Sequence, residues 1–148
     1  MDKQGVAVAA TVVAGGFIAL QAPINAGLGK RVGSLPAATV SFTIGTLVLI
    51  AITLLFSGGF GQVGEARHLP WYFLLGGVLG AIYVTTALIA VRTLGAGGVT
   101  GATIAGQLAM SVALDRAGVL GLAARGLTPG RIAGLALLAA GTFLVVTK

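Results

Sequence analysis

The chain has 148 residues, of which 57% are hydrophobic and only 8% are charged, and its formal net charge is +6. A soluble domain carries about 25% charged residues, so this chain could not cover a surface that faces water. Its mean hydropathy of +1.06 instead fits a protein that lies in lipid. The nine basic residues are scattered over short loops, which argues against a nucleic-acid patch and for a role in membrane topology.

Five continuous apolar runs are long enough to cross a hydrocarbon core, which needs about 20 residues per helix. They cover about 5–28, 36–57, 70–91, 96–114 and 130–147, and the short loops between them leave no room for a soluble domain. The first run is too long for a signal-peptide core and is interpreted as an uncleaved membrane helix. Because the runs do not alternate in polarity, membrane strands are not expected. We therefore predict an all-α, polytopic integral membrane protein, with one transmembrane domain of five helices over residues 1–148.

The basic residues give little bias between the two sides of the membrane. With five alternating helices, five basic residues lie on one side and four on the other: Lys3, Arg67, Arg116, Arg125 and Arg131 against Lys30, Arg31, Arg92 and Lys148. The positive-inside rule needs a clear excess to set an orientation. One interpretation is a weak preference that other signals resolve. The other is dual topology, in which oppositely inserted copies pair and give the inverted repeat common in transporters.

Glycines recur at helix-packing spacing within the predicted helices. Gly76 and Gly80 give a small-xxx-small pattern in the third run, and Gly130 and Gly134 give another in the fifth. In lipid, such residues let helix backbones approach closely, so they predict a tightly packed bundle or a dimer interface. The stretch GAGGVTG at 95–101 resembles a nucleotide-binding loop in letters only, because it follows no strand.

Polar residues inside the runs fall on common helix faces. Gln21 and Asn25 share one face of the first helix, and Thr103 and Gln107 begin a row on the fourth that Asp115 continues. Threonines of the second helix can bond to their own backbone, whereas Ser41 points away from them. Amides need partners from another helix or from water, so they either hold helices together or line a cavity. We predict a solute site near the bilayer midplane, with this lining: Gln21, Asn25, Tyr83, Thr103 and Gln107.

None of the three acidic residues lies at the centre of a predicted helix, where an ionised carboxylate would cost at least a few kcal/mol. Asp115 is the candidate gate or coupling residue. The alternative is a plain interfacial ion pair or turn former beside Arg116. His68 is expected to be an exposed loop residue.

The sequence contains no catalytic constellation. It has one histidine and no cysteine, so neither a metal cluster nor a thiolate site is expected, and no phosphate-binding loop follows a strand. We expect no enzymatic activity, no cofactor and no metal.

Several segments resemble one family of membrane proteins. They are the Gln21 and Asn25 pair, PAATVSFTIGTL at 36–47, GGVLGAIYV at 76–84, LGAGGVTGATIAGQLAMSVALDRAGVLG at 94–121 and RIAGLALLAAGTFLV at 131–145. Together they resemble the YdcZ-type family, a bacterial inner (plasma) membrane family of unknown function in the drug/metabolite transporter superfamily. The motif residues carried over by position are Gln21, Asn25, Ser41, Gly45, Gly80, Gln107, Asp115 and Gly118.

The resemblance implies half of a ten-helix transporter fold. It also implies an antiparallel dimer with a second copy or with a paired homologous chain. The small multidrug exporters of the same superfamily use a glutamate in the first helix, where this chain has Gln21 and Asn25, which argues against proton-coupled export of cationic drugs.

The predicted function is that of a small-solute transporter, working as an antiparallel homodimer in the lipid bilayer by alternating access. An uncharged lining favours a neutral or zwitterionic solute. Two alternatives remain open: a passive channel, and a non-transporting membrane subunit that binds a partner.

Overall fold

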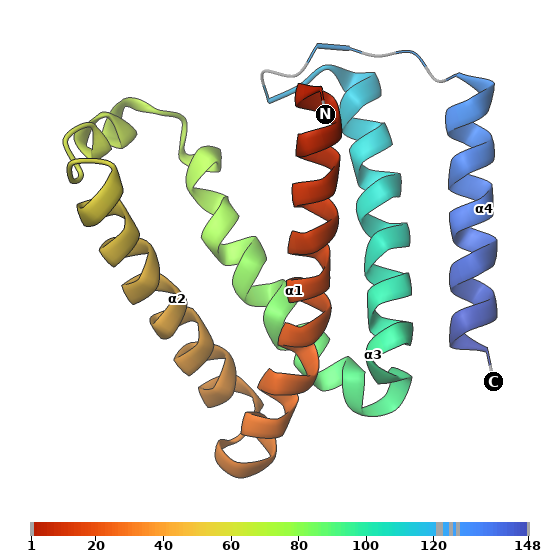
Figure 1. The fold of residues 1–148 in the computed structure, drawn as a ribbon, viewed down its shortest axis with the longest axis horizontal. Coiled ribbons are helices and arrows are strands. Elements are labelled where there is room, and N and C mark those ends of the chain that lie inside the picture. Colours follow the sequence, from red (N-terminus) through yellow and green to blue (C-terminus); the bar gives the residue numbers. More distant parts are fainter. Residues whose placement is uncertain (1, 121–122, 125, 127, 148) are drawn as a thin grey trace. The chain divides into compact units, whose positions relative to one another are not determined.

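The computed structural model describes residues 2–120, 123–124, 126 and 128–147. Figure 1 shows its helices in chain order. They are α1 (Lys3–Val32), α2 (Ser34–Phe56), the 3₁₀ turns η1 (Val63–His68) and η2 (Trp71–Leu74), α3 (Leu75–Ala117) and α4 (Pro129–Val146). The described residues form no strand, so the all-α prediction is confirmed. Arg125 and Lys148, which enter the predicted charge count, lie outside the described residues.

The ends of α1 and α4 follow from local side-chain chemistry. The Asp2 carboxylate accepts a hydrogen bond from the Gly5 amide at 2.8 Å, and the Thr128 hydroxyl accepts one from the Arg131 amide at 3.3 Å. Each caps an N–H group that has no partner within its helix. Gly33, with a φ of 94°, ends α1 and directly precedes α2, so the two helices are joined by a single residue. A side chain at that φ would be strained.

Helix α3 is two helical segments rather than one rod. Gly95 interrupts it with φ 70° and ψ 171°, a backbone conformation that only glycine adopts readily. The segments, 75–94 and 96–117, overlap the third and fourth predicted runs, about 70–91 and 96–114. The first of them begins at Leu75 rather than at Pro70, because residues 71–74 form the 3₁₀ turn η2.

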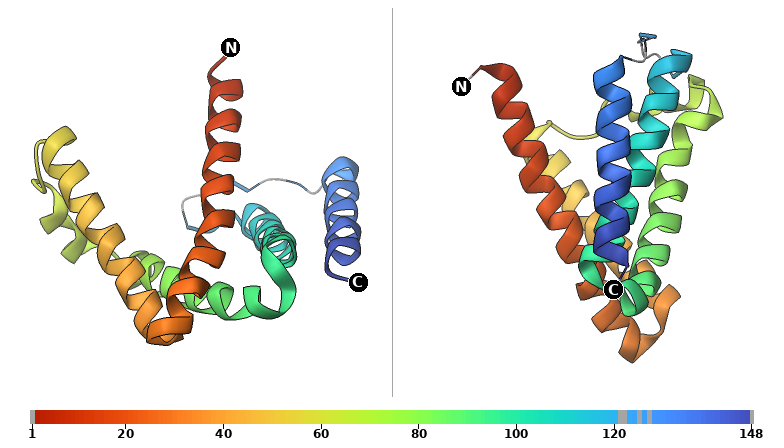
Figure 2. Two further views of the ribbon diagram at one scale, coloured as in Figure 1. Left: turned by 60° about the horizontal axis from the view of Figure 1, so that its bottom comes forward. Right: turned by 90° about the vertical axis from the view of Figure 1, so that its right-hand side faces the viewer.

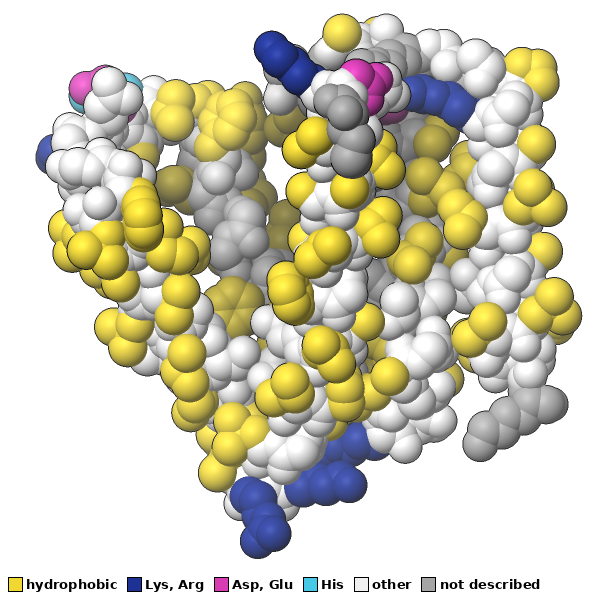
Figure 3. Space-filling view, in the orientation of Figure 1, with side chains coloured by type: hydrophobic (Ala, Val, Ile, Leu, Met, Phe, Trp, Pro, Cys, Tyr) yellow, Lys and Arg dark blue, Asp and Glu magenta, His cyan; other side chains and the backbone are white. Residues whose placement is uncertain are grey.

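Among the described residues, four helices are long and apolar enough to cross a membrane, if Trp71–Ala117 is counted as one. Large apolar side chains stand exposed along them: Phe56 is 82% and Leu137 is 74% exposed. Figure 3 shows this apolar surface, with the charged side chains gathered near helix ends. A surface of this kind is stable in lipid, whereas in water it would drive association.

The chain divides into two compact units, Met1–Arg92 and Thr93–Lys148, and each is described by itself. In the first unit, α1, α2 and residues 75–92 meet near the α1–α2 turn, visible in Figures 1 and 2. The core there consists of Ala26, Ala38, Val84 and Leu88, with Tyr83 and Val91 packed against it. The Phe42 ring lies 3.3 Å from where a Cβ on Gly80 would stand, so this motif glycine lets α2 pack on α3.

In the second unit, residues 96–117 of α3 and helix α4 lie side by side in both views of Figure 2. A Cβ on Gly101 would lie 3.4 Å from the Thr142 side chain, and a Cβ on Gly97 would lie 3.7 Å from the Val145 side chain. The stretch GAGGVTG therefore serves close helix packing, a role that the sequence analysis missed. In contrast, no described atom outside its own helix backbone lies within 4 Å of such a Cβ on Gly130 or Gly134.

Candidate functional site

A groove of about 520 Å³ runs along α1 and α2 in the first unit. Three polar residues lie in its wall: Gln21 and Asn25 from α1, and Ser41 from α2. The remaining lining is apolar: Phe17, Ile18, Leu20, Ile24, Leu28, Val40 and Ile44. No charged side chain lines this groove in the part of the chain that the structure describes. A mostly apolar pocket of this size with a few convergent polar groups is typical of small-molecule sites.

Asn25 is the buried polar residue of this groove. Only 5% of it is exposed, and its Nδ2 atom has no hydrogen-bond acceptor among the described residues. An unpaired buried donor costs about 1–3 kcal/mol, so a site of this kind gains from any acceptor that enters it. Gln21 lies one helical turn away on the same face and is exposed. The α1 face therefore offers one buried amide and one accessible amide to the same groove.

Ser41 is the groove residue that the predicted lining omitted. The sequence analysis placed it on the face of α2 opposite the threonines, and the structure shows that this face meets the amides of α1. The threonine face behaves as expected, because Thr39 and Thr43 donate to the carbonyls of Leu35 and Thr39 at 3.1 and 2.9 Å. That face borders a separate groove of about 490 Å³.

The other predicted lining residues lie elsewhere. Tyr83 is half-buried and packs against the core cluster of the first unit instead of lining the groove. Thr103 and Gln107 belong to the second unit, where Thr103 is half-buried and Gln107 is exposed. The backbone carbonyl of Gln107 accepts a hydrogen bond from the Ser111 hydroxyl at 2.7 Å. Of the five predicted residues, the structure thus brings Gln21 and Asn25 into one groove.

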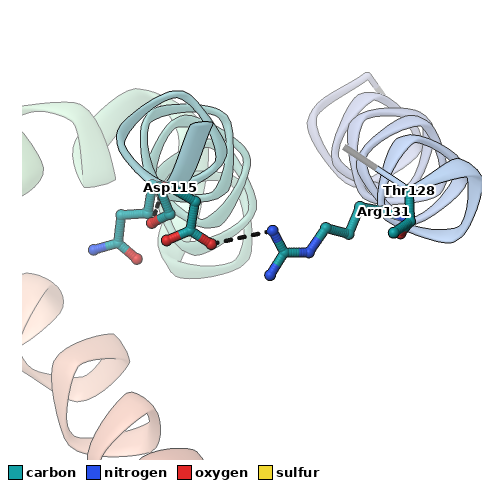
Figure 4. A network of polar contacts seen from close by, with 5 residues as sticks. Asp115, Thr128 and Arg131 are labelled. Atoms are coloured by element: carbon teal, nitrogen blue, oxygen red, sulfur yellow. Dashed lines mark hydrogen bonds and ion pairs between the residues drawn. The ribbon is translucent and has the colours of Figure 1, made fainter. Parts of the chain in front are cut away.

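Asp115 forms an ion pair with Arg131, not with its neighbour Arg116. Figure 4 shows Arg131 extending from α4 toward Asp115 on α3, with 3.2 Å between Arg131 Nη1 and Asp115 Oδ2. Adjacent residues on a helix point about 100° apart, which is why Arg116 does not face the carboxylate. The pair borders a groove of about 230 Å³ between the two helices.

Gly118, the last motif glycine, ends α3. A Cβ there would lie 2.9 Å from the Ala124 Cβ and 3.2 Å from its backbone, and the Gly118 amide donates to the Leu114 carbonyl at 3.0 Å. The glycine therefore lets the chain fold back closely after the helix. No group of three histidine, cysteine, aspartate or glutamate side chains that could hold a metal occurs among the described residues.

Long apolar helices with exposed aliphatic side chains define a multi-pass helical membrane protein. Residues 6–144 match the model of the family described as "Putative inner membrane exporter, YdcZ", and the chain belongs to this family. It is accordingly a multi-pass protein of the inner membrane and a membrane transporter. No curated protein and no solved structure matches the chain.

Proposed function

We propose that the chain carries a small neutral or zwitterionic solute across the inner membrane by alternating access, and that the solute binds at the groove of Gln21, Asn25 and Ser41. The observation that carries this proposal is the buried Asn25 amide, which has no acceptor among the described residues and lies beside a second amide and a hydroxyl. A solute carbonyl or hydroxyl would supply that acceptor. The uncharged wall disfavours a solute with net charge, because it offers no counter-ion.

The membrane arrangement is part of the proposal. The Gly95 break divides α3 into segments 75–94 and 96–117, each about 30 Å long at 1.5 Å per residue, which is the thickness of a hydrocarbon core. The chain would then cross the membrane five times, as half of a ten-helix drug/metabolite transporter fold. An antiparallel second copy, or a paired homologous chain, would supply the other half.

The near-equal basic count on the two predicted sides supports dual insertion. In the assembled dimer, Tyr83, Thr103 and Gln107 would complete the lining, with Asp115 as a gate or coupling residue. A reporter fused to the C-terminus tests the topology. Activity on both sides of the membrane is the expected result, and activity on one side only would reject dual topology.

Purified protein in liposomes tests the transport step. A screen of neutral and zwitterionic metabolites for thermal stabilisation would first identify a solute, and its uptake would then be measured against concentration. We expect saturable flux in the wild type and its loss in Asn25→Leu. The matched control is Thr11→Val, because the Thr11 hydroxyl donates to the Ala7 carbonyl of its own helix and lies outside the groove.

The same assay separates the alternatives. Flux that rises linearly with solute and shows no countertransport would indicate a passive channel. The absence of flux for every stabilising solute would favour a non-transporting subunit. Saturable flux that survives in Asn25→Leu would show that the solute binds outside this groove. Saturable flux that survives in Gln107→Leu would show that Gln107 does not belong to the proposed lining.

A further inference from the structure

The Asp115–Arg131 pair opposes the dipoles of both helices that carry it. Asp115 lies in the last turn of α3, where the helix end is partially negative, and Arg131 lies in the first turn of α4, where it is partially positive. Helix ends favour the reverse arrangement. Neither charge is therefore placed to stabilise its own helix, which suggests that the two have another role.

The hydrogen-bonding capacity of this pair is largely unused. Arg131 Nη1 is 3.2 Å from Asp115 Oδ2, yet this buried nitrogen makes no aligned hydrogen bond to any described residue. The two side chains are 33% and 29% exposed, so other polar atoms of the guanidinium and of the carboxylate can be reached from outside. A ligand that brings an anionic acceptor and a cationic donor could exchange one poorly aligned pair for two aligned ones.

An apolar groove leads away from the charges. Its apolar walls are Leu108 and Val112 of α3 and Leu135 and Leu138 of α4, while Gly134 leaves it open. Ser111 also lines the groove, and its hydroxyl donates to the Gln107 backbone carbonyl. At 1.5 Å per residue, Leu108 lies about 10 Å along its helix from Asp115. The groove is therefore charged at the helix ends and apolar along the helices.

In a bilayer this polarity matches that of a lipid. Helix α4 has 18 residues and so spans about 27 Å, close to the hydrocarbon thickness. Arg131, its third residue, would then lie at headgroup depth, and the leucines would lie among acyl chains. A volume of about 230 Å³ admits a headgroup, with the acyl chains following the open groove into the membrane.

We propose that this groove binds a zwitterionic phospholipid with a primary amine, phosphatidylethanolamine, with the phosphate on Arg131 and the ammonium on Asp115. The guanidinium can hold phosphate oxygens in a bidentate manner, and the ammonium can donate to the carboxylate. Phosphatidylcholine has no N–H donor for Asp115. Phosphatidylglycerol has no cation, which would leave the carboxylate near a phosphate without compensation. We therefore expect the groove to bind phosphatidylethanolamine more tightly than phosphatidylcholine, and phosphatidylcholine more tightly than phosphatidylglycerol.

The full-length protein in detergent, titrated with lipid, tests this site without any knowledge of the transported solute. Phosphatidylethanolamine is expected to raise the unfolding temperature by about 3 °C more than phosphatidylcholine or phosphatidylglycerol. Arg131→Gln and Asp115→Asn should each abolish that difference. Arg116→Gln, next to Asp115 but outside the groove lining, should preserve it.

Gly134→Leu keeps the proposal testable if either charge variant folds poorly. It fills the open groove, leaves both charges in place and replaces glycine by a good helix former. We expect it to lose the ethanolamine preference as well. Three results would each overturn the proposal: an equal or larger shift with phosphatidylglycerol, an equal shift with free O-phosphoethanolamine, or an undiminished preference in Gly134→Leu. Because the groove of Asn25 is not involved, these results stand apart from the outcome of the transport assays.

Discussion

The Thr142 hydroxyl of α4 donates a hydrogen bond to the Gly101 carbonyl of α3 at 3.0 Å, at a helix contact where Gly101 has no Cβ to keep the two backbones apart. The two features depend on each other. Without a Cβ on Gly101, the helices approach closely enough for the hydroxyl to reach a carbonyl on the facing helix. This hydrogen bond is shorter than the 3.2 Å ion pair between Arg131 of α4 and Asp115 of the segment 96–117, and it lies in the glycine-rich stretch 95–101.

Thr142→Val tests the strength of that link. The substitution keeps the shape of the side chain and removes the donor, so the free energy of unfolding should fall by about 0.5–1 kcal/mol. Denaturant unfolding in detergent, followed by circular dichroism, measures it. Thr39→Val is the matched control, because its hydroxyl bonds only to its own helix at Leu35. An equal loss in both variants would show that the interhelical bond contributes nothing specific.

Gly95→Ala probes the break in α3. A φ of 70° with a ψ of 171° is accessible to glycine and strained for alanine, so we expect a loss of about 1–3 kcal/mol in unfolding free energy. Gly15→Ala, inside α1 with open space around its Cβ position among the described residues, should instead raise stability by about 0.5–1 kcal/mol. A stable Gly95→Ala variant would mean that the two segments can join as one straight helix.

Asn25→Leu should separate stability from transport. Leucine removes a buried amide donor that has no described acceptor, so the unfolding temperature should stay the same or rise. The same variant is expected to lose saturable flux. Thermal unfolding by intrinsic fluorescence, measured alongside the liposome assay, checks both expectations in one preparation. A marked drop in unfolding temperature would indicate that Asn25 holds the fold together through a partner.

Ser41→Ala tests the residue that α2 adds to the groove. Loss of one hydroxyl that bonds to the solute should weaken solute affinity by about 2–10-fold, with little effect on folding. Thr43→Val is its control, since that side chain borders the other groove. Concentration-dependent stabilisation by the identified solute measures the change. Equal affinity in wild type and Ser41→Ala would remove this hydroxyl from the site.

Local features of the fold could be predicted from the chain because they depend on residues near in sequence. The start of α4, predicted near residue 130 and found at Pro129, and the amide face of α1 are of this kind, since capping and helix periodicity act over a few residues. The site was predicted less completely. Gln21 and Asn25 share a groove, but Ser41 was named only as a motif residue and not as lining, and Tyr83 packs against the core of the first unit.

Composition and short-range spacing were enough to predict that this protein lies in lipid, and to predict the type and approximate limits of its helices, because they decide which segments are apolar enough for a bilayer. The contacts between helices depended on the fold: Arg131 pairs with Asp115, Thr142 donates to Gly101, and Ser41 lines the same groove as the amides of α1. The reason is physical. A side chain's partner depends on which helices pack together and at what register. Small residues such as Gly101 allow close packing but do not specify which helix packs against them.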